Sequence, residues 1–332
     1  LPDAIEAEIE ALILDHPEQI TLQSGTAVGA ISEYANAKED YISYLASCIA
    51  ADCTGMRVVL DCANGSSSAT AESLFTRLGA EVHMLSASPD GTNINKNCGS
   101  THMENLMEYV KTHECDLGLA FDGDADRCLA VDENGVLIDG DQIMAACGLD
   151  RKGRGALPGD TVVATVMSNL GLHVFAKEHG LKLEITDVGD RNVLERMLEQ
   201  GYVLGGEQSG HMIFTDYATT GDGQLTALQV LSLLKESGKK ASELFGACAR
   251  YPQVLINVPV ADNDVKKAVM ASQALWDAVK AEEEQLAGSG RILVRPSGTE
   301  ALMRVMVEAK TEDVARQTAQ RLAQMIPSLA KE

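Results

Sequence analysis

Apolar runs that are typical of buried strands alternate with amphipathic stretches along residues 41–131. Apolar positions in the amphipathic stretches recur at helical spacing, which favours helices between the strands. Alternation of this kind predicts a parallel or mixed sheet with right-handed crossovers. The predicted strands are 57–61, 81–85, 116–121 and 128–131. The predicted helices are 41–51, 69–78 and 105–113.

The same rhythm begins again after a Gly- and Pro-rich stretch at 151–159, which we interpret as a domain boundary. The second unit has roughly the size and element order of the first, although the residue identities do not repeat. We therefore expect a structural duplication. The predicted strands of this unit are 159–165, 183–186 and 203–204. Its predicted helices are 170–179, 191–199 and 225–236.

The pattern changes after Pro252, where strands and longer helices suggest a small α+β domain of about 80 residues. The predicted fold class is therefore α/β, with two similar mixed-sheet α/β domains followed by a smaller α+β C-terminal domain. The strands expected in this last domain are 254–260, 291–294 and 302–307, and its helices lie within 265–286 and 313–326. The predicted segments are 1–34, with one short helix at 5–14, then 35–150, 151–250 and 251–332.

Composition narrows the classes of partner. The net charge of −22 argues against nucleic acid and anionic membranes, and no apolar run approaches the roughly 18 residues of a membrane-spanning helix. An anionic substrate would therefore need a local basic site that acts against the overall field. Eight cysteines are scattered without a C-x-x-C pair, which favours reduced thiols and a cytoplasmic location.

Three carboxylates, Asp122, Asp124 and Asp126, alternate in a short loop between two predicted strands, and Arg127 closes the run. Ionising all three costs free energy unless a cation is present. A hard divalent ion with oxygen ligands is the natural partner, and three carboxylates suit Mg²⁺ whose remaining positions are filled by phosphate or water. The loop is therefore a candidate magnesium site.

Other interpretations of this loop are weaker. An EF-hand would place its ligands at similar positions up to Glu133, but it needs Gly where Arg127 stands and helices where strands are predicted. A metal-dependent phosphatase would need a D-x-D-x-[TV] motif, and Ala125 followed by Asp126 does not fit it. A solvated acidic turn without function is the remaining alternative.

Two further loops carry candidate binding groups. Residues 205–211 surround Glu207, Ser209 and His211 with glycines, and a carboxylate beside a hydroxyl suits sugar hydroxyls. Residues 295–300 combine a guanidinium, two hydroxyls and a glycine, which is the composition of a phosphate cradle. An ordinary turn is the alternative for each loop. The candidate groups of the phosphate cradle are Arg295, Ser297, Gly298, Thr299 and Arg304.

Two helix starts are also of interest. Residues 219–223 precede a long apolar helix, and Asp222 is expected to cap it. Asp190 and Arg191 open another helix and are candidate substrate-binding residues, although Arg191 could equally be solvated.

The three loops at 122–127, 205–211 and 295–300, in this order and separation, resemble the α-D-phosphohexomutase family. The resemblance extends from about residue 35 to the C-terminus and is strongest to the branch that acts on amino-sugar phosphates; Gln208 favours that branch. Supporting segments are 61–65, 89–102, 188–191 and 219–223.

The resemblance implies a four-domain α/β protein that interconverts glucosamine 6-phosphate and glucosamine 1-phosphate through a phosphoserine and a bisphosphate intermediate. It implies Mg²⁺ on the three aspartates, Arg127 beside the phosphoserine, and His211 as a proton carrier. Glu207 and Ser209 would bind sugar hydroxyls, and the cradle at 295–304 would hold the phosphate that is not reacting. A homodimer is left open.

One departure from the family pattern is serious. The family's nucleophile lies in a loop resembling Ser-Ala-Ser-His-Asn-Pro, and neither Ser24 nor Ser100 has that context. We therefore expect residues 1–34 to be a remnant of the first domain, and the chain alone to be inactive as a mutase. The alternatives are a phosphomannomutase or phosphoglucomutase specificity, or a fragment that binds sugar phosphate without catalysis.

Overall fold

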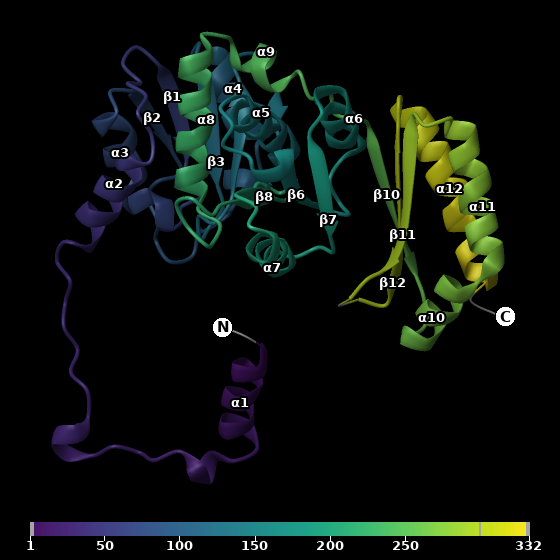
Figure 1. The fold of residues 1–332 in the computed structure, drawn as a ribbon, viewed down its shortest axis with the longest axis horizontal. Coiled ribbons are helices and arrows are strands. Elements are labelled where there is room, and N and C mark those ends of the chain that lie inside the picture. The colour runs from purple at the N-terminus through teal and green to yellow at the C-terminus, as the bar shows by residue number, and fades with distance from the viewer. Residues whose placement is uncertain (1–2, 299, 330–332) are drawn as a thin grey trace. The chain divides into compact units, whose positions relative to one another are not determined.

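The structure is a computed structural model that describes residues 3–298 and 300–329. It divides into two compact units, Leu1–Asp40 and Tyr41–Glu332. The first unit contains helix α1 (Asp3–Leu14) and extended chain with two short turns (Figure 1). None of its described side chains is buried. The predicted helix at 5–14 is confirmed.

The second unit starts within helix α2 at Tyr41, and its first sheet has five strands in the order β2-β1-β3-β4-β5. The first three of these strands are parallel, and β4 and β5 run antiparallel to their neighbours. The strands are β1 (Arg57–Asp61), β2 (Glu81–Leu85), β3 (Leu117–Phe121), β4 (Cys128–Asp132) and β5 (Leu137–Ile138). The helices of this part are α2 (Ala37–Ser47), α3 (Ala71–Arg77) and α4 (Glu104–Thr112).

The next sheet has the order β7-β6-β8-β9 and repeats the pairing of the first. Its central strand β6 is parallel to β7 and β8, and β9 is antiparallel to β8, as β4 is to β3. The expected duplication and fold class are confirmed. The strands are β6 (Thr161–Thr165), β7 (Lys182–Thr186), β8 (Leu204–Gly206) and β9 (Met212–Phe214). The helices are α5 (Gly140–Gly153), α6 (Leu170–His179), α7 (Asp190–Gln200), α8 (Gly223–Ser237) and α9 (Ala241–Phe245).

Helix α5 was not predicted, and it passes through the expected boundary at 150/151. Nearly its whole first half is buried, so the sequence shows no amphipathic period there. Its start is fixed by a capping box in which Asp139 accepts from the Gln142 N–H and the Gln142 side chain bonds back to the Asp139 N–H. The second repeat therefore uses residues before 150.

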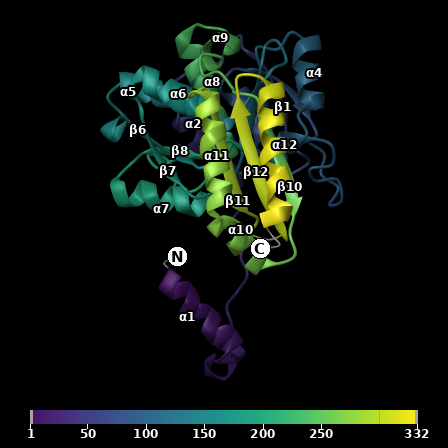
Figure 2. The same ribbon diagram turned by 90° about the vertical axis from the view of Figure 1, so that its right-hand side faces the viewer.

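The C-terminal part is an antiparallel sheet in the order β10-β12-β11. Helices α11 and α12 cover one of its faces (Figure 2). The buried residues of this part form a core separate from that of the α/β sheets. The long helix expected within 265–286 is in fact two helices, since Ser272 interrupts it. The elements are β10 (Gln253–Pro259), α10 (Asn263–Ala271), α11 (Gln273–Leu286), β11 (Gly290–Pro296), β12 (Leu302–Ala309) and α12 (Glu312–Leu329).

The two α/β sheets share one hydrophobic core. Helix α8 follows the second sheet in sequence but packs against β4 and β3 of the first, and it also contacts α5. The same cluster of buried residues contains Leu60 of β1, Phe214 of β9 and Leu228 of α8. All eight cysteines are buried and free. Among the described residues, no helix has the length and apolar character needed to cross a bilayer.

A buried polar network joins the C-terminal sheet to helix α6. Glu308 of β12 is fully buried and accepts hydrogen bonds from the Leu170 N–H (2.8 Å), Asn169 Nδ2 (3.1 Å) and Arg291 Nε (3.2 Å). These donors satisfy a carboxylate that would otherwise be costly to bury. The junction is therefore held by a few strong polar contacts.

Asp141 extends this network into α5, because its Oδ2 accepts from the Asn169 N–H at 2.6 Å. Burial, together with the charge of Asp139, raises the pKa of Asp141 from 3.8 to about 7. The folded protein therefore favours the protonated carboxyl. Ionisation of Asp141 should therefore lower the free energy of unfolding by on the order of a few kcal/mol as pH rises from about 4 to 7. This loss should stay constant above pH 7.

We expect Asp141→Asn to remove this cost, because an amide keeps the acceptor for the Asn169 N–H and carries no charge. The melting temperature of the variant relative to the unchanged chain should therefore increase between pH 5 and pH 8. Thermal unfolding at several pH values measures this difference. The exposed Asp313→Asn change is the matched control and should show no such trend. An Asp141→Asn difference that is the same at every pH would contradict the expectation.

Candidate functional site

The acidic loop (residues 122–127) and the Glu207 loop (residues 207–211) occupy equivalent positions in the two repeats. The first connects β3 to β4, and the second connects β8 to β9. The two loops meet directly, since the Cys128 N–H donates to the Gly210 carbonyl at 3.0 Å and Arg127 forms an isolated antiparallel bridge with His211. The duplicated turns therefore build one site.

The three aspartates of the acidic loop converge as predicted. Each of Asp122, Asp124 and Asp126 offers a ligand atom, and these atoms lie within 4.8 Å of one another. Asp122 is buried, whereas Asp124 is exposed. The residues fit a cation, because Asp126 Oδ1 is buried and has no hydrogen-bond partner among the described residues.

The charges in the acidic loop affect one another. Burial, followed by the nearby carboxylates of Asp126 and Asp124, raises the pKa of Asp122 to about 7. Burial also acts to raise the pKa of Asp126, but hydrogen bonds with Asp122 and His211 outweigh it and hold that pKa below its usual range. Positive charge is therefore favoured at the centre of the loop.

Arg127 lies against the aspartates. Its Nε is 3.8 Å from Asp122 Oδ2 and 4.0 Å from Asp126 Oδ1, and its own N–H donates to Asp122 Oδ1 at 3.1 Å. These side-chain distances are ion-pair distances, longer than hydrogen bonds. Among the described residues the Nε–H has no hydrogen-bond acceptor.

His211 connects the two loops through its side chain. Its ring is buried, and Nδ1 lies 2.8 Å from Asp126 Oδ2. The other nitrogen, Nε2, is buried and has no hydrogen-bond partner in the described part of the chain. The ring packs against Gly221, where a Cβ would lie 2.3 Å from Cε1, 2.4 Å from Nε2 and 2.8 Å from Nδ1. Only glycine leaves room for the imidazole at this point.

The start of α8 holds the acidic loop from the other side. Asp222 caps the helix as predicted, because its Oδ1 accepts from the Leu225 N–H at 2.9 Å. Tyr41 donates its hydroxyl to Asp222 Oδ2 at 2.9 Å, and the Gly223 N–H donates to the Ala125 carbonyl at 2.8 Å. The packing role of Gly221 and Gly223 was not predicted. The signal available in the sequence was a glycine on each side of the capping Asp222.

Glu207 and Ser209 line a cavity of about 370 Å³. Glu207 Oε1 accepts from the Gly189 N–H at 3.0 Å, and its Oε2 accepts from the Ser209 hydroxyl at 3.3 Å. The carboxylate is thus fixed against the segment that opens α7. The other residues that line the cavity are Leu129, Leu137, Asp139, Thr165, Met167, Val188, Gln208 and Arg250.

Three further candidate residues lie at or near this cavity. Asp190 and Arg191 are exposed at the start of α7, and Arg191 Nε pairs with Glu195 Oε1 at 2.9 Å. Neither is among the residues that line the cavity. Gln208 lines the cavity, and its amide donates to Asp139 Oδ2 at 3.2 Å.

The phosphate cradle is the turn between β11 and β12. Arg295 and Arg304 are cross-strand neighbours, and burial together with the charge of Arg304 lowers the pKa of Arg295. Like charges placed side by side are costly and are typical of an anion site. Arg304 pairs with Glu300 at 2.9 Å, while its Nε is buried without a hydrogen-bond partner among the described residues. Thr299 lies outside the described residues.

The turn is supported by a cation that the sequence did not reveal. Lys266 of α10 is buried and donates to the Ser297 carbonyl at 2.8 Å. The Ser297 hydroxyl in turn accepts from the Glu300 N–H at 3.2 Å, and Gly298 is exposed at the tip. In the described part of the chain, the hydrogen bonds and ion pairs of this turn stay within the C-terminal domain.

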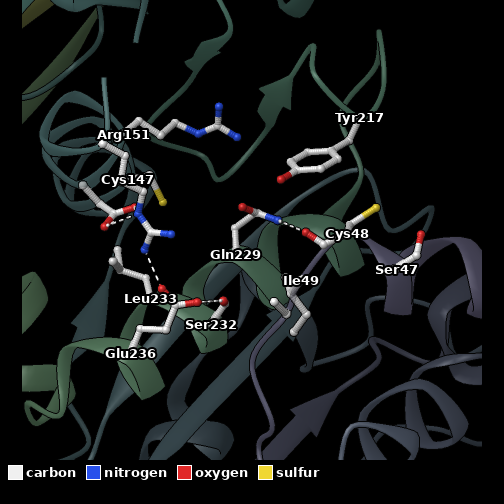
Figure 3. Close-up of a pocket in the computed structure, with 13 residues that line it drawn as sticks. Ser47, Cys48, Ile49, Cys147, Arg151, Tyr217, Gln229, Ser232, Leu233 and Glu236 are labelled. Atoms are coloured by element: carbon white, nitrogen blue, oxygen red, sulfur yellow. Dashed lines mark hydrogen bonds and ion pairs between the residues drawn. The ribbon is translucent and has the colours of Figure 1, made fainter. Parts of the chain in front are cut away.

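A different cavity, of about 360 Å³, lies among α2, α5 and α8 (Figure 3). Its two arginines are both neutralised: Arg151 pairs with Asp216 at 2.5 Å, and Arg154 pairs with Glu236 at 2.5 Å. None of the candidate site residues is among those that line it.

Three sequence models of phosphoglucomutase/phosphomannomutase match the chain: alpha/beta/alpha domain II at residues 39–135, alpha/beta/alpha domain III at 139–251, and the C-terminal domain at 255–325. Phosphoglucosamine mutase of Ruminiclostridium cellulolyticum is 51% identical over 98% of this chain and 72% of its own length. That of a Thermoanaerobacter species is 52% identical, with the same shares covered.

Solved structures with the same fold include two phosphohexomutases. A phosphoglucomutase/phosphomannomutase family protein of Burkholderia thailandensis has a TM-score of 0.77 and 23% identity, over 99% of this chain and 70% of that one. N-acetylphosphoglucosamine mutase of Aspergillus fumigatus, in complex with GlcNAc-6P and magnesium, has a TM-score of 0.74 and 21% identity, over 91% and 68%.

We expect Gly221→Ala to separate the two loops, because the new Cβ would overlap the His211 ring. Overpacking of this kind costs about 1–3 kcal/mol. It should also weaken Mg²⁺ binding, since His211 would lose its contact with Asp126. Thermal unfolding and calorimetric titration with Mg²⁺ measure the two effects. Gly153→Ala in the last turn of α5 is the control, because no atom lies within 4 Å of a Cβ there. Equal behaviour of the two variants would refute the expectation.

Proposed function

The chain belongs to the phosphoglucomutase/phosphomannomutase family, and from this we propose that it carries the metal, sugar and phosphate sites of a phosphoglucosamine mutase. The reaction would interconvert glucosamine 6-phosphate and glucosamine 1-phosphate. Relatives of that name, about half identical over nearly the whole chain, support the amino-sugar specificity. The observation that carries the proposal is the direct pairing of the acidic loop with the Glu207 loop.

Asp122, Asp124 and Asp126 would hold Mg²⁺, which supplies Lewis-acid polarisation and charge neutralisation at the phosphoryl group. The clustering of their oxygens and the magnesium in the Aspergillus fumigatus relative support this assignment. Arg127 would place a second positive charge beside the same group. Phosphoryl transfer depends mainly on positioning and charge stabilisation, which these residues can provide.

The sugar would be gripped in the cavity beside the acidic loop. Glu207 and Ser209 would bind its hydroxyls, because both line the cavity and the carboxylate is fixed by the Gly189 N–H. His211 would carry a proton at Nε2, the ring nitrogen that has no partner among the described residues. Asp190 and Arg191 would act only at the rim, since they are exposed at the start of α7.

The turn between β11 and β12 would hold the phosphate that is not reacting. Arg295 and Arg304 supply the charge, and Ser297 and Gly298 supply donors at the tip. Thr299 completes the motif in sequence. We retain the division into a first segment, two α/β domains and an α+β domain, with the second α/β domain beginning at the Asp139 cap of α5.

The source of the transferred phosphoryl group is a separate proposal. The 332 residues contain no loop like Ser-Ala-Ser-His-Asn-Pro. We therefore propose that the chain by itself binds sugar phosphate but does not complete the mutase cycle. A coupled assay with glucosamine 6-phosphate, Mg²⁺ and glucose 1,6-bisphosphate should show no turnover by the chain alone. Ordinary turnover, or a phosphoserine found within these residues, would overturn this proposal.

We expect the chain to bind glucosamine 6-phosphate in the presence of Mg²⁺, and to bind glucose 6-phosphate and mannose 6-phosphate more weakly. Glu207→Gln and Arg295→Ala should each raise the Kd for glucosamine 6-phosphate about tenfold or more, because each removes a charged hydrogen-bonding group. Isothermal titration calorimetry provides the measurement.

Arg316→Ala is the control for these variants, since Arg316 pairs with Glu312 on the exposed face of α12. It should leave the Kd unchanged. If glucosamine 6-phosphate does not bind, or binds equally well to all variants, the assignment of the site is wrong. If all three sugar phosphates bind equally, the family assignment of the site stands and the amino-sugar specificity does not.

A further inference from the structure

One face of the C-terminal sheet carries a row of polar side chains that crosses all three of its strands. Arg304 of β12 lies directly opposite Arg295 of β11 on one side and Asn257 of β10 on the other, and we call these three residues the Arg304 row. Directly opposed residues of antiparallel strands point to the same face, with their Cβ atoms about 4.5–5.5 Å apart. The two arginines belong to the phosphate cradle, whereas Asn257 belongs to none of the motifs found in the sequence.

The Arg304 row lies on the face of the sheet that is turned away from α11 and α12 (Figure 1). An immediate chain neighbour of each of its residues is buried in the core that these helices cover, namely Val258, Val305 and Val294. Successive side chains of a strand point to opposite faces, so the row points away from that core. Asn257 is exposed and both arginines are partly exposed, so a ligand can reach all three.

The positive charge of the Arg304 row is only partly neutralised by the protein. Arg304 pairs with Glu300 at 2.9 Å, but its buried Nε has no hydrogen-bond partner among the described residues. Arg295 has neither an acidic partner nor a hydrogen-bond acceptor in the described part of the chain, and the charge that acts on it is that of Arg304. Two adjacent cations with a single acidic partner leave a net positive charge, which favours a bound anion.

Asn257 is an unusual residue for its position in the sheet. Asparagine is depleted in strands, yet Asn257 stands in the interior of β10, where its amide makes no hydrogen bond to any described residue. The preceding residue of β10 on the same face, Leu255, lies opposite the buried Met306, which is an ordinary apolar pair. Asn257 instead places two N–H donors opposite Arg304, and it does so without adding charge. These donors are free for a ligand.

We propose that Asn257 is a further substrate-binding residue, whose side-chain amide donates a hydrogen bond to the phosphate that Arg295 and Arg304 hold. The inference rests on the function proposed for the turn between β11 and β12. A phosphate ester offers three strong acceptor oxygens, so it can bind donors from several directions at once. A neutral amide adds a donor without the repulsion that a third adjacent cation would cause. The phosphate site therefore extends from the turn across all three strands of the sheet.

Three variants test the role of Asn257 by calorimetric titration with glucosamine 6-phosphate in the presence of Mg²⁺. Asn257→Ala should raise the Kd about tenfold, because a hydrogen bond to a charged group is lost. Asn257→Asp should raise the Kd further, since the new carboxylate repels the phosphate and pairs with the arginines. Gln317→Ala removes an exposed amide from α12 and is the matched control, which should leave the Kd unchanged.

Double variants show which part of the ligand Asn257 contacts. In an Arg295→Ala background, Asn257→Ala should raise the Kd much less than it does in the unchanged chain, because the phosphate is no longer held in place. In a Glu207→Gln background, Asn257→Ala should raise the Kd by its full factor, because Glu207 acts on the sugar. A general weakening of the fold would not depend on which second residue is changed.

Two further measurements separate binding from folding. The melting temperature and the Kd for Mg²⁺ alone should be the same for Asn257→Ala and the unchanged chain. Asn257 is exposed and its side chain makes no hydrogen bond to the described residues, so its removal leaves no buried group without a partner.

The outcomes distinguish this inference from the proposed function. If Arg295→Ala weakens the binding of glucosamine 6-phosphate and Asn257→Ala does not, the role of Asn257 is refuted and the proposed function stands. If the unchanged chain does not bind glucosamine 6-phosphate, both are refuted. If Asn257→Ala weakens binding by the same factor in the Arg295→Ala background, or lowers the melting temperature, Asn257 does not contact the phosphate and the inference is wrong.

Discussion

Two turns approach each other closely through their main chains, and this contact determines the geometry of the candidate site. The turn after β3 is hydrogen-bonded through its backbone to the turn after β8 and to the start of α8, and a glycine stands at each of these hydrogen bonds, Gly210 and Gly223. A Cβ at Gly210 would lie 2.9 Å from the Cys128 carbonyl carbon, and one at Gly223 would lie 2.9 Å from the Ala125 oxygen. Backbone without side chains at these points lets Asp126 and His211 come within hydrogen-bond distance. The rest of the site is built outward from that contact.

Negative and positive charge are concentrated at two different turns of the chain. The acidic loop concentrates three carboxylates at one turn, and their mutual repulsion is relieved by a bound cation. The turn between β11 and β12 does the reverse, because it places two arginines side by side in a chain of net charge −22. Like charges repel one another within each cluster when no ligand is bound. A ligand of opposite charge relieves this repulsion, and the relief adds to the free energy of binding.

Most of this architecture was predictable from sequence because the signals are local. The bounds of β1 and β2 and of α6 coincide with the apolar runs, and the cap at Asp222 was identified from its position before a long helix. The convergence of the three aspartates followed from their spacing within a single turn. Helix α5 was missed because burial on all sides removes the amphipathic period on which such a prediction depends.

The features that were not predictable arise from contacts between distant segments. Lys266 supports the turn at Ser297 from another helix, and nothing in its own neighbourhood marks it. Arg250 lines the same cavity as Glu207, from which it is distant along the chain. The hydrogen bond between Gln208 and Asp139 was hidden for the same reason, since the two residues lie far apart along the chain. The spacing of residues in the sequence identifies the functional groups that a loop contains. Tertiary packing determines which of these groups already have a partner within the protein.

The core shared by the two α/β sheets also constrains how the polypeptide is made. Its buried residues run from Ile42 to Cys248, and α8 of the later repeat closes over the sheet of the earlier one. A nascent chain leaving the ribosome cannot seal the first sheet until α8 has been synthesised, so that sheet waits with one face uncovered. The C-terminal domain, with a core of its own, carries no such delay. The rate at which the residues up to α8 are translated therefore determines how long the apolar face of the first sheet stays exposed to chaperones and to aggregation.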